Sequence, residues 1–311
     1  MRYFRTYPWA LQLLLFVLMI FTLASLGQLC LQVLLPKVYG VQLSSVLQVN
    51  EHSAPEMIHV ALLAQGILSV MLFMVPSLLF ANFAHPKPKQ YLGLNAPKRP
   101  AHMVLSVMLI VTAMPLLMQL EWGMSQINFG PDVKVKQAAA EAVQKAFLTM
   151  PTFADFLRTF IVMAIIPAIG EELFFRGMLM RFARQKARNM VMPIVFTAVI
   201  FAFSHSNYYG MPSILLAGAL LAVIYYLTGS IWNGILAHMV FNGSQVLLTY
   251  LHVVSDSSNG LHVGVILGDG LLFGWTLQML WQRRTPLADN WYQDFDQPKN
   301  TETDKESAIF N

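Results

Sequence analysis

Long apolar runs are the feature that most constrains how this chain can fold. A helix needs about 20 apolar residues to span a bilayer, and eight runs of roughly this length follow one another along the sequence. Short polar stretches separate them, and neither an internal repeat nor a separate soluble domain is evident. The sequence therefore predicts an all-α fold, a polytopic membrane bundle of about eight transmembrane helices. The runs are Trp9–Leu35, Met57–Phe83, Ala101–Leu120, Phe153–Ile169, Met190–His205, Met211–Tyr226, Ile231–Leu251 and Leu261–Trp281.

The composition supports this assignment. Of the 311 residues, 56% are hydrophobic and 12% are charged, whereas soluble domains carry about 25% charged residues. The net charge of +4 comes from basic residues between the apolar runs, which is typical of cytoplasmic loops and not of nucleic-acid binding. The single cysteine, Cys30, excludes an intramolecular disulfide and a cysteine-based zinc cluster. We therefore expect the lipid bilayer as a partner and no nucleic acid, and the sequence leaves the oligomeric state open.

The basic residues also predict an orientation, because cytoplasmic loops are enriched in Lys and Arg. With eight spans, the basic clusters fall on one side, so both termini are expected in the cytoplasm, and the compact plan favours a plasma (inner) membrane of bacterial type. On the other side, residues 132–150 are amphipathic and predict a helix along the membrane surface. The basic clusters are Arg2 and Arg5, Lys87 to Arg99, Arg181 to Arg188, and Arg283 with Arg284.

One stretch breaks the apolar pattern. Residues 170–177 read GEELFFRG and place three ionisable groups directly after an apolar run, where such groups are costly and need partners. Glu172 and Arg176 stand at i and i+4 of a helix, in the order that favours an ion pair. Adjacent helix residues point about 100° apart, so Glu171 needs donors from another helix. A carboxylate set apart in this way suits a general base for water.

Later runs carry conspicuous polar residues that fit this need. The fifth run ends in FAFSH with His205, and the seventh carries HMVFN, with His238 and Asn242 on one helix face. A glutamate and two histidines are enough to hold and activate a water. An asparagine amide can donate a hydrogen bond to the oxyanion that forms when the water attacks a carbonyl.

The three motifs EExxxR, FxxxH and HxxxN, in this order and inside apolar runs, resemble the CPBP family of CAAX prenyl proteases and bacteriocin-processing enzymes, also called the Abi family. The resemblance covers roughly Phe153 to Leu251. It implies a polytopic helical enzyme that cleaves peptide bonds within or near the membrane. We therefore expect residues 1–281 to form one transmembrane domain with its catalytic core at about 153–251, and residues 282–311 to form a polar, disordered cytoplasmic tail.

Carried over residue by residue, the resemblance implies a division of roles. Glu171 would activate water with help from His205. His238 and Asn242 would bind the scissile carbonyl and its oxyanion. Glu172 and Arg176 would support the site structurally.

Metal dependence is open at this stage, because the family has been described both as metalloproteases and as metal-free glutamate proteases. Two histidines and a glutamate match catalytic zinc ligation, and the zinc ligands would then be Glu171, His205 and His238. The sequence has no HExxH motif, however, and these residues come from three separate helices. We therefore favour direct activation of water by Glu171 and His205, without a cofactor.

Other readings of the same residues compete with this one. Glu171, Glu172 and Arg176 could be a cluster at a helix end that reaches the membrane surface. His205 could cap a helix near the lipid headgroups, and His238 and Asn242 could simply hold helices together. Buried ionisable groups also suit a proton-coupled transporter, although no inverted repeat supports that. A non-catalytic membrane scaffold is the remaining alternative. An enzyme would act on a membrane-anchored peptide or protein, and nothing in the sequence indicates a prenyl pocket.

One geometric expectation conflicts with a shared site. Measured along straight helices at 1.5 Å per residue, His238 lies about 10 Å and His205 about 22 Å from the cytoplasmic helix ends. Straight, perpendicular helices would keep these two side chains apart, whereas tilted or offset helices, or a different loop position, would bring them together.

Overall fold

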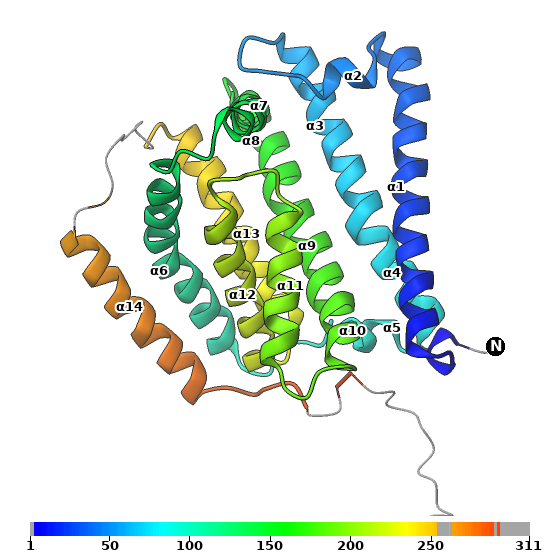
Figure 1. Ribbon diagram of the computed structural model, residues 1–311, viewed down its shortest axis with the longest axis vertical. Coiled ribbons are helices and arrows are strands. Elements are labelled where there is room, and N and C mark those ends of the chain that lie inside the picture. Colours follow the sequence, from blue (N-terminus) through cyan, green and yellow to red (C-terminus); the bar gives the residue numbers. More distant parts are fainter. Residues whose placement is uncertain (1–2, 254–260, 262, 289–290, 293–311) are drawn as a thin grey trace, which may run out of the picture.

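The computed structural model describes residues 3–253, 261, 263–288 and 291–292, and all regular structure in these residues is helical. Each predicted apolar run forms a helix, and these helices pack side by side in one bundle (Figure 1). The polytopic all-α fold is thereby confirmed. The long elements are α1 (Trp9–Tyr39), α3 with α4 (Pro55–Ser69, Val75–Ala84), α6 (Pro100–Ser125), α8 to α10 (Phe153–Phe160, Ile166–Glu172, Met180–Arg184), α11 (Val191–Phe203), α12 (Met211–Thr228), α13 (Ile231–Tyr250) and α14 (Val263–Gln282).

Five of the described helices are long and apolar enough to cross a membrane. Two of the other three predicted spans differ for identifiable reasons. α11 has only 13 residues, whereas α13 and α14 have 20 each; α13 carries polar side chains that include Asn233, His238 and Asn242. The five are Trp9–Tyr39, Pro55–Ala84, Pro100–Ser125, Phe153–Arg184 and Met211–Thr228.

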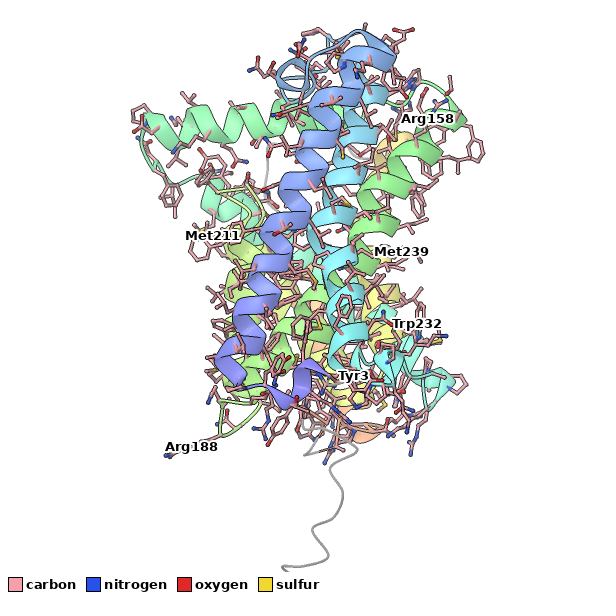
Figure 2. The ribbon with its side chains drawn as sticks, turned by 90° about the vertical axis from the view of Figure 1, so that its right-hand side faces the viewer. Tyr3, Arg158, Arg188, Met211, Trp232 and Met239 are labelled. Atoms are coloured by element: carbon pink, nitrogen blue, oxygen red, sulfur yellow. The ribbon has the colours of Figure 1, made fainter. Side chains whose placement is uncertain are left out.

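The predicted basic clusters gather at one end of the bundle. The N-terminal segment, α5 (Pro88–Tyr91), α10 and the end of α14 all lie there (Figure 1). Arg158 lies at the opposite end from Tyr3 and Arg188 (Figure 2). The amphipathic segment forms α7 (Pro131–Phe147), which lies across this opposite end, roughly perpendicular to the bundle (Figure 2). The arrangement agrees with an even number of crossings, and the cytoplasmic location of the basic end remains a prediction.

The backbone is irregular around α9. π-Helical segments precede it (η3, Ile161–Ile165) and follow it (η4, Leu173–Leu179), and a third, η2 (Val70–Met74), packs against it. Two of these segments come just before a proline, Pro76 or Pro167. A proline has no N–H and crowds the carbonyl four residues earlier, and a π-helical turn accommodates that crowding. The helix that carries the two glutamates is therefore bounded by non-α backbone.

Two loop segments, together called the floor, pack beneath the place where the end of α12 meets the start of α13. The first follows α5: Ile231 N–H donates to the carbonyl of Gly93 at 3.1 Å, and the Ser230 hydroxyl donates to the carbonyl of Asn95 at 2.6 Å. The second follows α14, where Thr285 N–H donates to the carbonyl of Leu227 at 2.8 Å. α13 therefore begins inside the bundle and not at its outer edge.

The second floor segment corrects a prediction. We expected residues 282–311 to be a disordered tail, but Trp291 is buried and meets the ring of Tyr225 edge-on, with the ring centroids 5.8 Å apart. Leu287 N–H also bonds to the carbonyl of Tyr226 at 3.0 Å. The aromatic side chain of Trp291 supplies apolar area that the polar composition of the segment conceals. Residues 293–311 lie outside the described residues.

We predict that Gly93→Ala destabilises the protein more than Gly40→Ala. Both glycines have a positive φ, +76° and +69°, so both substitutions incur similar backbone strain. A Cβ at Gly93 would overlap the Tyr225 hydroxyl, whereas one at Gly40 meets nothing within 4 Å. The overlap should cost Gly93→Ala about 1–3 kcal/mol more, measured by unfolding in mixed micelles. Equal losses would show that Tyr225 moves aside freely.

Candidate active site

The Glu172–Arg176 ion pair predicted from the helix spacing is present. Arg176 Nη1 donates to Glu172 Oε1 at 2.7 Å, and Nη2 donates to the carbonyl of Gly218 on α12 at 2.6 Å. Both side chains are fully buried. The guanidinium also lies over the ring of Phe201 on α11, 5.1 Å from its centroid. The pair therefore joins the end of α9 to α11 and α12.

His238 connects this ion pair to Glu171. Its Nδ1 lies 3.1 Å from Glu172 Oε1, and its Nε2 lies 3.9 Å from Glu171 Oε2. Because the salt-bridged Glu172 carboxylate is an acceptor, we assign the proton of this contact to Nδ1. Nε2 is then the nitrogen directed at Glu171. The close approach of α13 depends on Gly234, where a Cβ would meet Glu172 Oε2 at 2.9 Å.

His205 approaches Glu171 from a third segment. Its Nδ1 lies 2.7 Å from the carbonyl of Phe201, so Nδ1 carries the proton, and its Nε2 lies 3.9 Å from Glu171 Oε2. The sequence placed His205 within a span, but α11 ends at Phe203 and His205 lies in the following turn. The His205 side chain is 34% exposed and that of Glu171 is 10% exposed. This side of the cluster is therefore the one nearest to solvent or substrate.

The predicted conflict in depth is resolved by the staggered helix ends. Ile231, the first residue of α13, packs at the level of Gly177. Gly177 lies six residues after Glu171, and His238 lies seven residues after Ile231, so both side chains are about 10 Å along their helices from this level. The depths calculated for straight helices that begin at one plane therefore do not apply, because α13 begins inside the bundle, and the offset helices bring His205 and His238 to the same Glu171 oxygen.

Asn242 has a different environment from the other predicted residues. Its Nδ2 donates to the carbonyl of Met163 in η3 at 3.2 Å. Pro167 stands four residues after Met163 and has no N–H, so this carbonyl lacks its α-helical donor. The Asn242 amide supplies a donor in its place. The structure therefore brings Glu171, His205 and His238 together, and places Asn242 one turn further along α13.

The described residues provide no ligand set for the zinc alternative. No three His, Cys, Asp or Glu side chains there are placed to hold a metal ion. We therefore derive no step through a metal.

Comparison with known proteins agrees with this geometry. Residues 153–244 match the family model for type II CAAX prenyl endopeptidase Rce1-like proteins. These residues form an Rce1-like domain of the CPBP family. The match begins at the first residue of α8 and ends two residues after Asn242, so it includes every residue of the three motifs. No curated protein and no solved structure matches the chain. The Rce1-like match supports an intramembrane CAAX-type endopeptidase in general.

Sequence reasoning did not anticipate Gly218, Pro167 or Gly234. Gly218 acts through a backbone carbonyl, for which the sequence offers no signal. Pro167 was visible beside the motif, and a proline before intramembrane acids could have suggested a carbonyl in need of a donor.

We predict that Arg176→Ala destabilises the protein far more than Arg158→Ala. Arg158 also pairs with an acid on its own helix, Asp155, at 2.8 Å, but its side chain is 51% exposed. Removing Arg176 leaves the Glu172 carboxylate buried beside His238 only, which should cost about 3–5 kcal/mol. The exposed pair should contribute about 0–1 kcal/mol. Unfolding in mixed micelles measures both, and similar losses would mean that the buried pair does not hold the bundle together.

Proposed function

We propose that this protein is an intramembrane endopeptidase that hydrolyses peptide bonds of membrane-associated substrates. The observation that carries the proposal is the meeting of Glu171, His205 and His238, from three separate segments, around one carboxylate oxygen inside an apolar bundle. Peptide hydrolysis in lipid needs such a polar pocket, because water and charge are otherwise excluded there. The Rce1-like match points to the same reaction class.

Glu171 is the base in this mechanism. Within the described residues, its buried Oε2 has no hydrogen-bond partner, and separations of 3.9 Å to both histidines suit groups that share a bridging water. Glu171 takes a proton from the water, assisted by His205, while the water oxygen bonds to the scissile carbonyl carbon. The proton then passes to the amide nitrogen as the C–N bond breaks. The products are a carboxylic acid and an amine, and transfer of the remaining acidic proton gives a carboxylate and an ammonium group.

His238 is suited to bind the oxyanion. In its imidazolium form, His238 carries an N–H on each ring nitrogen. The Nδ1–H group then donates to Glu172, and the Nε2–H group is available to donate to the developing oxygen anion. Asn242 adds a second donor, because its amide has two N–H groups and only one is needed for the carbonyl of Met163. Glu172 and Arg176 are supporting residues.

The substrate is a membrane-anchored peptide or protein. The family description concerns CAAX prenyl endopeptidases, so prenylated protein C-termini are the first class to test. We propose that the enzyme lies in the plasma (inner) membrane with both termini in the cytoplasm. The basic clusters at one end of the bundle support the orientation.

We predict opposite effects for the two neighbouring glutamates. Glu171→Gln should lower cleavage of a membrane-anchored, prenylated peptide in proteoliposomes by about 10²–10⁴-fold and leave the unfolding midpoint unchanged. Glu172→Gln should lower the midpoint, because it removes the charge that Arg176 pairs with. Loss of stability in Glu171→Gln, with cleavage retained, would contradict the assignment.

Solute or proton flux without cleavage would indicate a transporter, and full tolerance of both changes would indicate a scaffold. A chelator followed by zinc tests metal dependence in the same samples.

We predict that Pro167→Ala rescues the stability of Asn242→Ala but not its activity. Asn242→Ala removes the donor to the carbonyl of Met163, and Pro167→Ala restores a backbone N–H four residues after that carbonyl. If Asn242 also binds the oxyanion, the double variant should regain the wild-type unfolding midpoint and remain about 10²–10³-fold slow. Recovery of both properties would reduce Asn242 to a structural role.

A further inference from the structure

The turn that carries His205 is bound from outside the motif helices. The turn comprises residues 204–210, between α11 and α12. Asn207 organises it: its N–H donates to the carbonyl of His205 at 2.7 Å, and its Oδ1 accepts from Gly210 N–H at 2.8 Å. The end of α11 fixes the start of the turn, because Ser204 N–H donates to the carbonyl of Ile200 and His205 N–H to that of Ala202. The rest of the turn has no such helical hydrogen bonds and depends on contacts like those of Asn207.

Two further elements hold this turn. Asn207 Nδ2 donates to Glu121 Oε1, near the end of α6, at 2.9 Å. From α7, Gln137 Nε2 donates to Asn207 Oδ1 at 3.1 Å, and Gln137 Oε1 accepts from Tyr208 N–H at 2.9 Å. Gln137 is buried, although α7 is largely polar and mostly exposed. A buried amide with each end bonded to the same turn fixes that turn in two directions.

We propose that Asn207 and Gln137 are positioning residues that hold His205 against Glu171. Through Gln137, α7 then contributes to the activity of the enzyme. The inference rests on the proposed function, because the advantage of a fixed His205 is that its Nε2 stays near the Glu171 oxygen. Neither residue touches the reacting atoms. Both lie outside the three motifs, and Gln137 and Glu121 lie outside the Rce1-like segment.

The test compares Gln137→Ala and Asn207→Ala with Gln144→Ala in the full-length protein. Gln144 lies on α7 two turns further along, and among the described residues its side chain forms no hydrogen bond. We expect kcat to fall about 10- to 100-fold in the first two variants with KM nearly unchanged, and both constants to stay at the wild-type value in Gln144→Ala. A rise in KM with kcat unchanged would instead make α7 a substrate-binding helix and overturn the proposal.

Two readouts do not depend on cleavage. Hydrogen exchange should be about 2- to 10-fold faster at the Tyr208 amide in Gln137→Ala and at the Gly210 amide in Asn207→Ala. Carbethoxylation of His205, followed by peptide mass spectrometry, should be faster in both. If the wild-type protein cleaves nothing but these two changes occur, the proposed function fails and the positioning contacts stand. If neither changes, the positioning proposal fails whether or not the protein is a protease.

A charge-swapped pair separates positioning from general loss of structure. Asn207→Asp should lower kcat, because it loses the N–H donor and places a carboxylate beside Glu121. Adding Glu121→Gln restores a donor and an acceptor at that contact, while the new carboxylate still accepts from Gly210 and Gln137. We expect the double variant to recover most of the lost kcat and wild-type reactivity of His205. Failure to recover, with a normal unfolding midpoint, would overturn the proposal.

Discussion

The buried Glu172–Arg176 pair is the interaction on which the rest of the structure depends. A charge in an apolar bundle is tolerable only when its hydrogen bonds are satisfied by other groups. Here one carboxylate oxygen contacts both Arg176 and His238, and the guanidinium reaches the carbonyl of Gly218. The same contacts that neutralise the charge also fix α12 and α13 against α9. The cost of burying the Glu172 and Arg176 charges therefore specifies the register of α12 and α13 relative to α9.

This arrangement gives the two adjacent acids different surroundings. Glu172 is fully buried and is occupied by Arg176 and His238, whereas Glu171 faces two histidine nitrogens at 3.9 Å. Neighbouring positions on a helix point in different directions, so Glu172 faces Arg176 and His238 whereas Glu171 faces the two histidine Nε2 atoms. The irregular backbone on both sides of α9 agrees with a functional site at this position, since π-helical turns often occur at functional sites.

Much of the fold and part of the site were predictable from sequence. The apolar runs predicted the helices, and the i, i+4 spacing predicted the ion pair, because both depend on local periodicity. The meeting of Glu171, His205 and His238 was expected from the family resemblance and not from geometry; spacing along straight helices indicated the opposite. The residues that resolve this, such as Gly93 beneath Ile231, lie far away in sequence and act through backbone atoms.

Other differences have similar causes. Asn242 was expected at the oxyanion, but its visible partner is a carbonyl affected by Pro167, and the sequence does not show which helix faces which. His205 was placed in a helix because its surroundings are apolar, whereas the chain leaves α11 after Phe203. Hydropathy averages over such details, so it locates a segment in the membrane better than it locates the end of a helix.

The floor beneath α13 links the C-terminal segment to the chemistry. The N-terminus of α13 is hydrogen-bonded to the carbonyls of Gly93 and Asn95. Thr285 and Trp291 contact the adjoining end of α12. The height of His238 is therefore set by pieces of chain that precede and follow the family domain. An Rce1-like segment excised at its own boundaries would keep every motif residue yet lose these contacts, so the part of the chain that aligns the motif residues is larger than residues 153–244.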